Sequence, residues 1–286
     1  MPIRPRMESA PAGAWLDSRG ERERPPVHPM LSTAVKSARR AATVIQRASN
    51  NLDILKPEQK RPNDFVSEVD RAAENTIIDT LRSAYPDHAI LAEESGASGM
   101  GQSDYEWIID PLDGTTNYLH GYPYYCVSIA LAVKGVLTLG VVYDPAHNDL
   151  FTAERGGGAF LNERRIRVGK RTQLTDCLVS TGHPHVNTDQ LDTDMAMLKA
   201  MIQTTVGVRR QGSAALDLAY VACGRTDGYW EMNLNPWDIA AGALLVQEAG
   251  GIVTDLDGNE GWLDSGNVVA ANPKVMHQML QTLAKA

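Results

Sequence analysis

The stretch of sequence that decides the fold reads Tyr-Glu-Trp-Ile-Ile-Asp-Pro-Leu-Asp-Gly-Thr-Thr-Asn over residues 105–117. Residues 105–109 are a short apolar run of the kind that forms a buried β-strand. A strand that ends at Asp110 would place Asp110 and Asp113 at its C-terminal edge, where layered α/β proteins usually bind ligands. The stretch therefore predicts a strand that carries two carboxylates into a site.

The residue types in this stretch suit a metal ion and a phosphate. Asp110 and Asp113 supply the oxygen ligands that hard divalent cations prefer, and Pro111 between them fixes one backbone angle. Gly114 lets the backbone approach an anion closely because it has no Cβ, and the amides that follow can face a phosphate. For an isolated Asp-x-x-Asp pair, a tight turn with capping aspartates is an equally good interpretation.

Two further carboxylates stand at the ends of predicted elements. Glu93 follows the apolar run 89–92, and Asp238 stands in the first turn of a predicted helix. Four carboxylates placed in this way fit a multi-metal site, which clamps both oxygens of an in-line phosphoryl displacement. Taken singly, Asp238 can also be a helix cap, and Glu93 a solvated loop residue.

The first half of the chain, residues 27–170, predicts a mostly antiparallel sheet flanked by helices. We expect a polar loop over 60–65 and a mobile Gly- and Ser-rich loop over 97–104. Ser67 is the expected N-cap of the second helix. The predicted helices cover 29–49 and 67–85, and the predicted strands cover 89–92, 105–109, 125–133, 136–143, 150–153 and 159–168.

The second half, residues 171–286, alternates strands and helices, which indicates an α/β layer. Gly224 is the predicted stop of one of its helices. The predicted strands cover 178–181, 206–210, 227–232, 252–255 and 268–271, and the predicted helices cover 189–203, 213–223, 237–249 and 273–284.

Composition excludes several classes of protein. The 286 residues, 43% of them hydrophobic, suffice for one large domain or two modest ones. A net charge of -8 without a long basic block argues against general nucleic-acid binding. Cys126, Cys177 and Cys223 lack CxxC spacing, which favours free thiols in a reducing cytoplasm over a disulfide framework. The chain contains no apolar run of about 18 residues, so no membrane-spanning helix is predicted.

Residues 1–26 differ from the rest of the chain. They hold five of the fifteen prolines and mix five arginines with four acidic residues. We expect a disordered tail there. A second hypothesis is that the natural start lies at Val27 or Met30.

Three ordered motifs resemble those of the inositol monophosphatase family. Residues 107–118 are similar to the first motif of that family, residues 237–242 with 248–251 are similar to the second, and Glu93-Glu94-Ser95 resembles its Glu-Glu-Ser element. The resemblance runs from about residue 28 to 284, and residues 28–31 also resemble the bacterial extragenic-suppressor subfamily. It implies a five-layer αβαβα sandwich and a homodimer. It also implies Mg²⁺-dependent, lithium-sensitive hydrolysis of phosphate monoesters.

The resemblance assigns a role to each residue of the motifs. Glu93 and Thr115 orient the attacking water, and Asp70 accepts a hydrogen bond from Thr115. The amides of Gly114 and Thr115 hold the phosphate. The implied metal ligands are Glu93, Asp110, the Leu112 carbonyl, Asp113 and Asp238.

Substrate contacts also follow from the resemblance. Glu231 matches the family position that binds inositol hydroxyls, which suits an acceptor-only carboxylate. Thr116-Asn117 favours inositol phosphatases, whereas the related bisphosphate nucleotidases more often carry Lys-Gly there. His183-Pro184-His185 departs from the usual aromatic residues, and Lys60 is either a third-metal or phosphate contact or a solvated lysine. The segment that lines the same pocket in the family is matched here by Gly212, Ser213 and Ala214.

We therefore predict hydrolysis of inositol-1-phosphate, a small phosphorylated polyol. Another small phosphate or bisphosphate as substrate is the nearest alternative. A different class of function, binding to the ribosomal RNA transcription antitermination and maturation machinery, is implied by the resemblance alone. A basic segment could serve that binding role or could be a solvated hairpin face; it consists of Arg164, Arg165, Arg167, Lys170 and Arg171.

Overall fold

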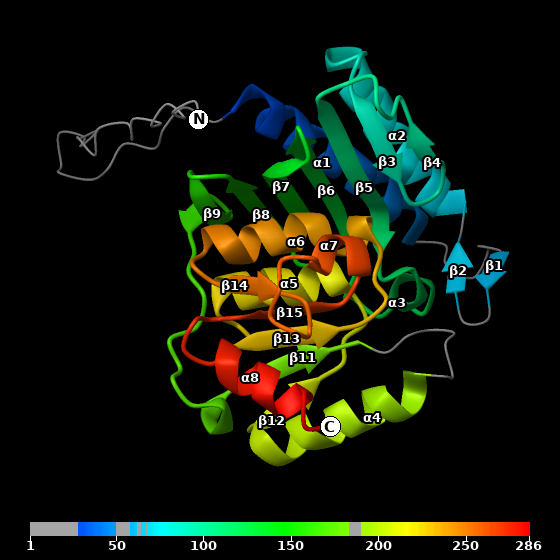
Figure 1. Cartoon of the computed structure of the whole chain (residues 1–286). Helices are drawn as coiled ribbons and strands as arrows, with labels where there is room; N and C mark the ends of the chain where they lie inside the picture. Colours follow the sequence, from blue (N-terminus) through cyan, green and yellow to red (C-terminus); the bar gives the residue numbers. More distant parts are fainter. Residues whose placement is uncertain (1–27, 50–57, 62–63, 67, 183–189) are drawn as a thin grey trace, which may run out of the picture.

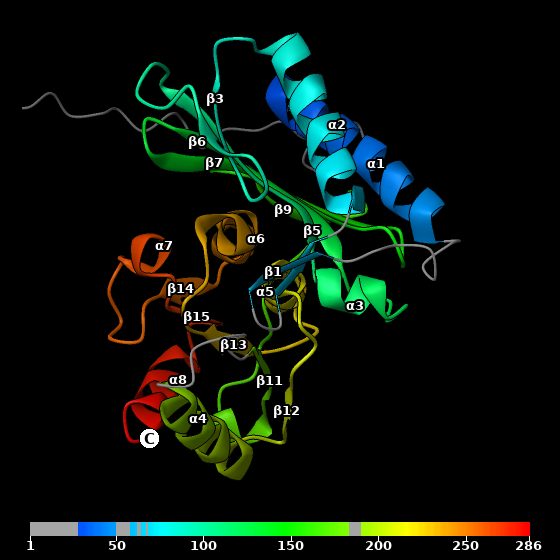
Figure 2. The same cartoon turned by 90° about the vertical axis from the view of Figure 1, so that its right-hand side faces the viewer.

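A computed structural model describes residues 28–49, 58–61, 64–66, 68–182 and 190–286 of the chain. Five layers alternate between helix and sheet (Figure 2). Helices α1 and α2 form the first layer, an eight-stranded sheet the second, α5 and α6 the third, a five-stranded sheet the fourth, and α4 and α8 the fifth. The predicted αβαβα sandwich is confirmed.

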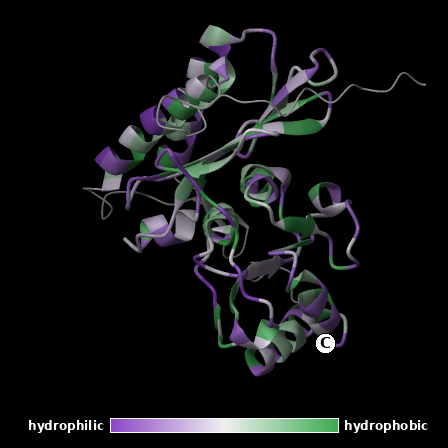
Figure 3. Ribbon diagram, turned by 90° about the vertical axis from the view of Figure 1, so that its left-hand side faces the viewer, coloured by the Kyte–Doolittle hydropathy of each residue, from purple (hydrophilic) through white to green (hydrophobic). Residues whose placement is uncertain are grey.

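The first layer is formed by α1 (Pro29–Ser49) and α2 (Glu68–Ala84). Each helix buries residues three and four positions apart, such as Ala34, Ala38, Ala41 and Ile45 of α1, which places them on one face. These faces pack on one side of the larger sheet in a common apolar cluster. Figure 3 shows hydrophilic residues on the outer helices and hydrophobic residues on the strands of the larger sheet.

The larger sheet is antiparallel except where β3 and β5 run parallel. Its strands, in spatial order, are β10 (Arg164–Arg165), β9 (Gly158–Leu161), β8 (Asp149–Glu154), β7 (Val136–Asp144), β6 (Cys126–Val133), β5 (Tyr105–Asp113), β3 (Ala89–Ala92) and β4 (Gly96–Ser98). A separate antiparallel pair consists of β1 (Glu58–Arg61) and β2 (Asp64–Val66).

The third layer, α5 (Ala214–Cys223) and α6 (Pro236–Glu248), lies between the two sheets (Figure 1). Residues 239–246 of α6 are all buried, as expected for a helix that is covered on every side. Gly140 on β7 allows a close approach, because a Cβ there would lie 2.9 Å from the carbonyl oxygen of Ala241. The central helices are thus held tightly against the larger sheet.

The smaller sheet and the last helix layer complete the second half. The strands, in spatial order, are β12 (Gly207–Arg209), β11 (Leu178–Thr181), β13 (Gly228–Glu231), β15 (Val268–Ala271) and β14 (Ile252–Thr254). The remaining helices are α3 (Thr115–Leu119), the 3₁₀ helix η2 (Leu174–Asp176), α4 (Leu191–Thr204), α7 (Trp262–Ser265) and α8 (Met276–Leu283).

Several predicted elements were wrong in detail. The loop expected over 97–104 begins inside β4, because pairing with the edge of β3 overrides its weak strand propensity. The polar loop expected over 60–65 has its ends in β1 and β2. The strand expected over 159–168 is a β9–β10 hairpin, because Asn162 and Glu163 both adopt positive φ. Helix α8 begins three residues late, after a turn closed by Asn272.

The predicted tail at residues 1–26, the cap at Ser67 and the segment His183-Pro184-His185 lie outside the described residues. The side chain of Lys60 is likewise outside the description. Within the described part of the chain, no helix has the length and apolar character needed to cross a membrane.

Gly140→Val should lower the free energy of unfolding by about 1–3 kcal/mol, because the added side chain meets the backbone of α6. Urea unfolding measures this. Val136→Thr on the same strand is the control: Val136 is 49% exposed, so we expect a change within about 0.5 kcal/mol. Equal stability of the two variants would contradict the close packing of α6 on β7.

Candidate active site

A β-bulge places the two aspartates of residues 110–113 on one face of the larger sheet. Strand β5 continues to Asp113, rather than ending at Asp110 as predicted. Asp110 pairs with Ser128 and Asp113 with Cys126, so three steps along β5 match two along β6. Residues three apart on a regular strand point to opposite faces, and the extra residue restores both carboxylates to the same face. Pro111 has no N–H to donate to the ladder, and it is tolerated here because the bulge interrupts the regular pairing.

Asp113 joins the two halves of the chain. Its Oδ2 accepts hydrogen bonds from the Ser213 hydroxyl at 2.6 Å and from the Ala215 amide at 2.8 Å. Ser213 is the N-cap of α5 and accepts in turn from the Leu216 amide. The carboxylate thus lies at a helix N-terminus, where negative charge is stabilised. The hydroxyl of Ser213, predicted to line the substrate pocket, is engaged by Asp113, a contact the sequence analysis missed.

Asp110 and Asp238 each have one oxygen fixed by a neighbouring amide. Asp110 Oδ1 accepts from the Leu112 amide at 2.9 Å. Asp238 Oδ2 accepts from the Asn235 amide at 2.7 Å at the start of α6. The capping interpretation of Asp238 is therefore right, but it uses only one oxygen of the carboxylate.

The second oxygens of the three aspartates have the chemistry of metal ligands. Among the described residues, none donates a hydrogen bond to Asp110 Oδ2 or Asp238 Oδ1, whereas the backbone amide of Ala214 also approaches the Asp113 carboxylate. Carboxylate oxygens of this kind are the ligands that Mg²⁺ and other hard cations prefer. The donor set therefore fits a divalent cation.

Electrostatics indicates that the predicted carboxylates lie near one another. Burial raises the pKa of Asp110 well above its usual range, and the charges of Glu93, Asp113 and Asp238 raise it further. Burial also raises the pKa of Asp238, with additional effects of Asp113 and Glu93. The pKa of Asp113 is raised to about 6 by burial, against the hydrogen bond from Ser213. A cation among these groups would offset their mutual repulsion.

The ligand atoms do not form a ready-made coordination shell. Across the residues that the structure describes, no three acidic, histidine or cysteine side chains converge closely enough to hold a metal ion. The assignment of Glu93, Asp110, Leu112, Asp113 and Asp238 as metal ligands therefore stays a prediction, supported by donor chemistry and charge.

Helix α2 supports two of the predicted catalytic groups. The Thr115 hydroxyl lies 2.9 Å from Asp70 Oδ1 and 2.9 Å from the Leu112 carbonyl oxygen, so the expected Thr115–Asp70 hydrogen bond is present. One turn further along α2, the buried carboxylate of Glu74 accepts from the amides of residues 94 and 95, directly after Glu93. The sequence analysis missed Glu74, although its position four residues after Asp70 puts both on one helix face.

The turn at Gly114 has the backbone that its sequence predicts. Gly114 adopts φ +91°, and a Cβ there would lie 2.9 Å from the Tyr124 carbonyl oxygen and 3.2 Å from that of Gly212. Only glycine fits this position. The same turn begins α3, a short helix that the sequence analysis did not predict, so the amides of Gly114 and Thr115 lie at a helix start.

The predicted substrate residues come from the second half of the chain. Glu231 ends β13, and burial raises its pKa to about 7. The Tyr229 hydroxyl donates to its carboxylate, and the absence of a Cβ at Gly182 leaves room beside it. The negative charge of Asp113 raises the pKa of Glu231 further, which indicates proximity to the carboxylate group.

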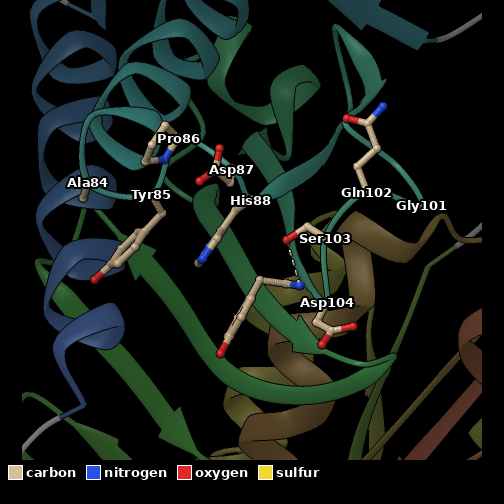
Figure 4. Close-up of a pocket in the computed structure, with 10 residues that line it drawn as sticks. Ala84, Tyr85, Pro86, Asp87, His88, Gly101, Gln102, Ser103 and Asp104 are labelled. Atoms are coloured by element: carbon tan, nitrogen blue, oxygen red, sulfur yellow. Dashed lines mark hydrogen bonds between the residues drawn. The ribbon is translucent and has the colours of Figure 1, made fainter.

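A cavity of about 720 Å³ lies away from these residues, between the turn after α2 and the loop before β5 (Figure 4). His88 stacks between Tyr85 and Tyr105, with ring centroids 4.8 and 4.5 Å away. The described residues that line it include Asp87 and Asp104 and no lysine or arginine. An acidic cavity without the predicted site residues is a poor site for a phosphate.

Comparison with known proteins identifies the class. The model of the inositol monophosphatase family matches residues 27–286, and the chain belongs to this family. The resemblance stated from the motifs is thereby confirmed.

Similar proteins extend over nearly the same length. The putative Nus factor SuhB of Neisseria meningitidis serogroup B is 55% identical over 258 residues, covering 90% of this chain and 99% of that protein. The Nus factor SuhB of Escherichia coli K12 is 47% identical, covering 90% and 96%. The crystal structure of the extragenic suppressor protein suhB of Bartonella henselae has a TM-score of 0.87 at 43% identity, covering 91% and 100%. The Thermotoga maritima IMPase has a TM-score of 0.83 at 36% identity, covering 90% and 98%.

Glu231→Gln should stabilise the fold more at high pH than at low pH. The raised pKa means that the folded chain binds this proton more tightly than the unfolded chain, so stability falls as pH rises from 4.5 through about 7. The glutamine side chain does not titrate, so the variant lacks this pH-dependent loss of stability. Thermal unfolding at about pH 5 and about pH 8.5 measures the difference. The exposed Glu260→Gln is the control, and an equal shift at both pH values for Glu231→Gln would refute the assignment.

Proposed function

We propose that this chain hydrolyses a phosphate monoester of a small polyol with the help of Mg²⁺, and that inositol-1-phosphate is the leading substrate. The observation that carries the proposal is the group of carboxylates around Asp110. Two of them, Asp110 and Asp238, have an oxygen without a hydrogen-bond donor among the described residues, beside a glycine turn suited to phosphate. The family model and the relatives solved as inositol monophosphatases support the same reaction.

In this mechanism the metal ion supplies Lewis acidity, which makes water easier to deprotonate and offsets charge on the phosphate. Its ligands would be Glu93, Asp110, Asp113, Asp238 and the Leu112 carbonyl.

Thr115 and Glu93 prepare the attacking water. Because the Thr115 hydroxyl donates its one proton toward Asp70 or the Leu112 carbonyl, its lone pairs remain free to accept a hydrogen bond from water. Glu93 accepts a second one, which points the water oxygen at phosphorus. The amides of Gly114 and Thr115 hold the phosphate oxygens.

The second half of the chain holds the polyol. Glu231 accepts hydrogen bonds from its hydroxyls, and the Gly212–Ala214 segment forms the adjacent wall. Lithium sensitivity, a homodimer and a cytoplasmic location belong to the same proposal.

The proposal is tested by phosphate release from inositol-1-phosphate, glycerol-2-phosphate, fructose-1,6-bisphosphate and adenosine 3′,5′-bisphosphate. Each substrate is assayed with Mg²⁺, with a chelator, and with added lithium. We expect Mg²⁺-dependent release that is fastest for inositol-1-phosphate. Preference for a bisphosphate would favour the alternative substrate class, and absence of release from all four would refute the enzyme.

Asp113→Asn should reduce turnover by several orders of magnitude, because it removes a charged metal ligand while keeping the side-chain shape. Asp104→Asn makes the same chemical change at an exposed surface ion pair and should leave turnover unchanged. Circular dichroism checks that both variants fold. Near-normal turnover in Asp113→Asn would contradict the metal assignment.

A second candidate function is a role as a Nus factor in ribosomal RNA transcription and maturation. The relatives named Nus factor SuhB, at 47–55% identity, favour it. In a bacterial strain that lacks the corresponding gene, rescue by Asp113→Asn would support a binding role, and loss of rescue would support catalysis.

A further inference from the structure

Asn117 connects three backbone segments that surround the glycine turn. Its side-chain amide nitrogen Nδ2 lies 2.8 Å from the Tyr124 carbonyl oxygen, 2.7 Å from that of Gln211 and 3.3 Å from that of Gly212. Asn117 belongs to α3 in the first half of the chain, whereas Gln211 and Gly212 precede α5 in the second. One side chain therefore joins the predicted phosphate turn to the predicted wall of the polyol pocket.

The three partners identify which end of the amide faces them. Carbonyl oxygens only accept hydrogen bonds, so the NH₂ group must point at them. This group has two hydrogens, which the two shorter contacts use, and the Gly212 carbonyl makes the weaker third contact. Replacement by a residue without donors would leave the Tyr124 and Gln211 carbonyls without this partner.

The glycine turn packs against the same oxygens. The space beside Gly114 is bounded by the carbonyls of Tyr124 and Gly212. Gly212 itself adopts φ +83°, and a Cβ there would lie 3.3 Å from Asn117 Nδ2. Gly114, Asn117 and Gly212 are thus interlocked, and a shift of residues 211–212 would be transmitted to the turn at Gly114.

We infer that Asn117 is a positioning residue that sets substrate selectivity by holding the wall at residues 211–213 in register with the phosphate turn. The inference rests on the proposed phosphatase function. Asn117 needs no contact with substrate for this task, because it acts through the carbonyls it binds. Loss of the link should harm substrates that use both the turn and the wall more than substrates that use the turn alone.

The test compares Asn117→Ala and the milder Asn117→Ser with His120→Ala. His120 lies at the C-terminal end of α3, and its side chain hydrogen-bonds the Thr116 carbonyl. Its variant therefore perturbs the same helix and leaves the Asn117 contacts intact. We measure kcat/KM for inositol-1-phosphate and for p-nitrophenyl phosphate, which lacks polyol hydroxyls. The selectivity ratio is kcat/KM for inositol-1-phosphate divided by kcat/KM for p-nitrophenyl phosphate. In Asn117→Ala this ratio should fall by about tenfold, with a smaller fall in Asn117→Ser. The ratio should stay constant in His120→Ala.

A second readout does not need activity. Arg209 and Arg210 are exposed directly before the held segment, so trypsin cleavage there, measured by mass spectrometry on the intact chain, reports local opening. Cleavage should be at least about fivefold faster in Asn117→Ala than in the wild type or His120→Ala. In the active enzyme, an unchanged selectivity ratio in Asn117→Ala would overturn the inference, whatever the cleavage rate. A wild type without phosphatase activity but with the cleavage difference would refute the proposed function and retain the link.

Discussion

The carboxylate of Asp113 accepts two hydrogen bonds from the first turn of α5, and the rest of the site depends on this contact. A hydrogen bond to a charged group contributes about 1.5–3 kcal/mol when it is buried. Here both donors, Ser213 and Ala215, come from the second half of the chain. Without them the motif of residues 110–114 would be a local turn at the end of a strand. With them, β5 and α5 are held in one orientation, and Asp238 on the neighbouring α6 is brought toward Asp110.

This arrangement places several carboxylates where charge is costly. Burial raises the pKa values of Asp110, Asp113 and Asp238 together, so a positive charge among them would favour their ionised forms. Each carboxylate has one oxygen fixed by a backbone amide, which orients the other oxygen. The layered fold supplies this geometry: the start of α5 bonds Asp113 at the β5 bulge, and the start of α6 bonds Ser128 on the neighbouring β6. A site built from element ends can be rigid without being rich in loops.

Much of this could be predicted from the sequence, and the reasons are specific. Strands such as 89–92 and 178–181 were predicted at their observed bounds, because a short, mostly apolar run between turn residues indicates a buried strand. The β5 bulge was missed because a bulge depends on the register of the partner strand, which no local pattern encodes. Helices α3 and α7 were missed because five and four residues are too few to show a period of 3.6. Contacts such as Ser213 with Asp113 join residues a hundred positions apart and follow only from the fold.

The dipeptide Thr116-Asn117 shows how a sequence signal and its physical cause can differ. Its value as a marker of inositol phosphatases suggests a contact with substrate, yet the Asn117 amide faces backbone carbonyls. One of these belongs to Tyr124, whose hydroxyl donates to the buried Asp217 of α5. Asn117 therefore acts within a chain of contacts that runs from α3 through Tyr124 to α5 and returns through residues 211–212. A side chain in this position could select among polyols, because it fixes the distance between the groups that we propose bind the phosphate and those that we propose bind the hydroxyls.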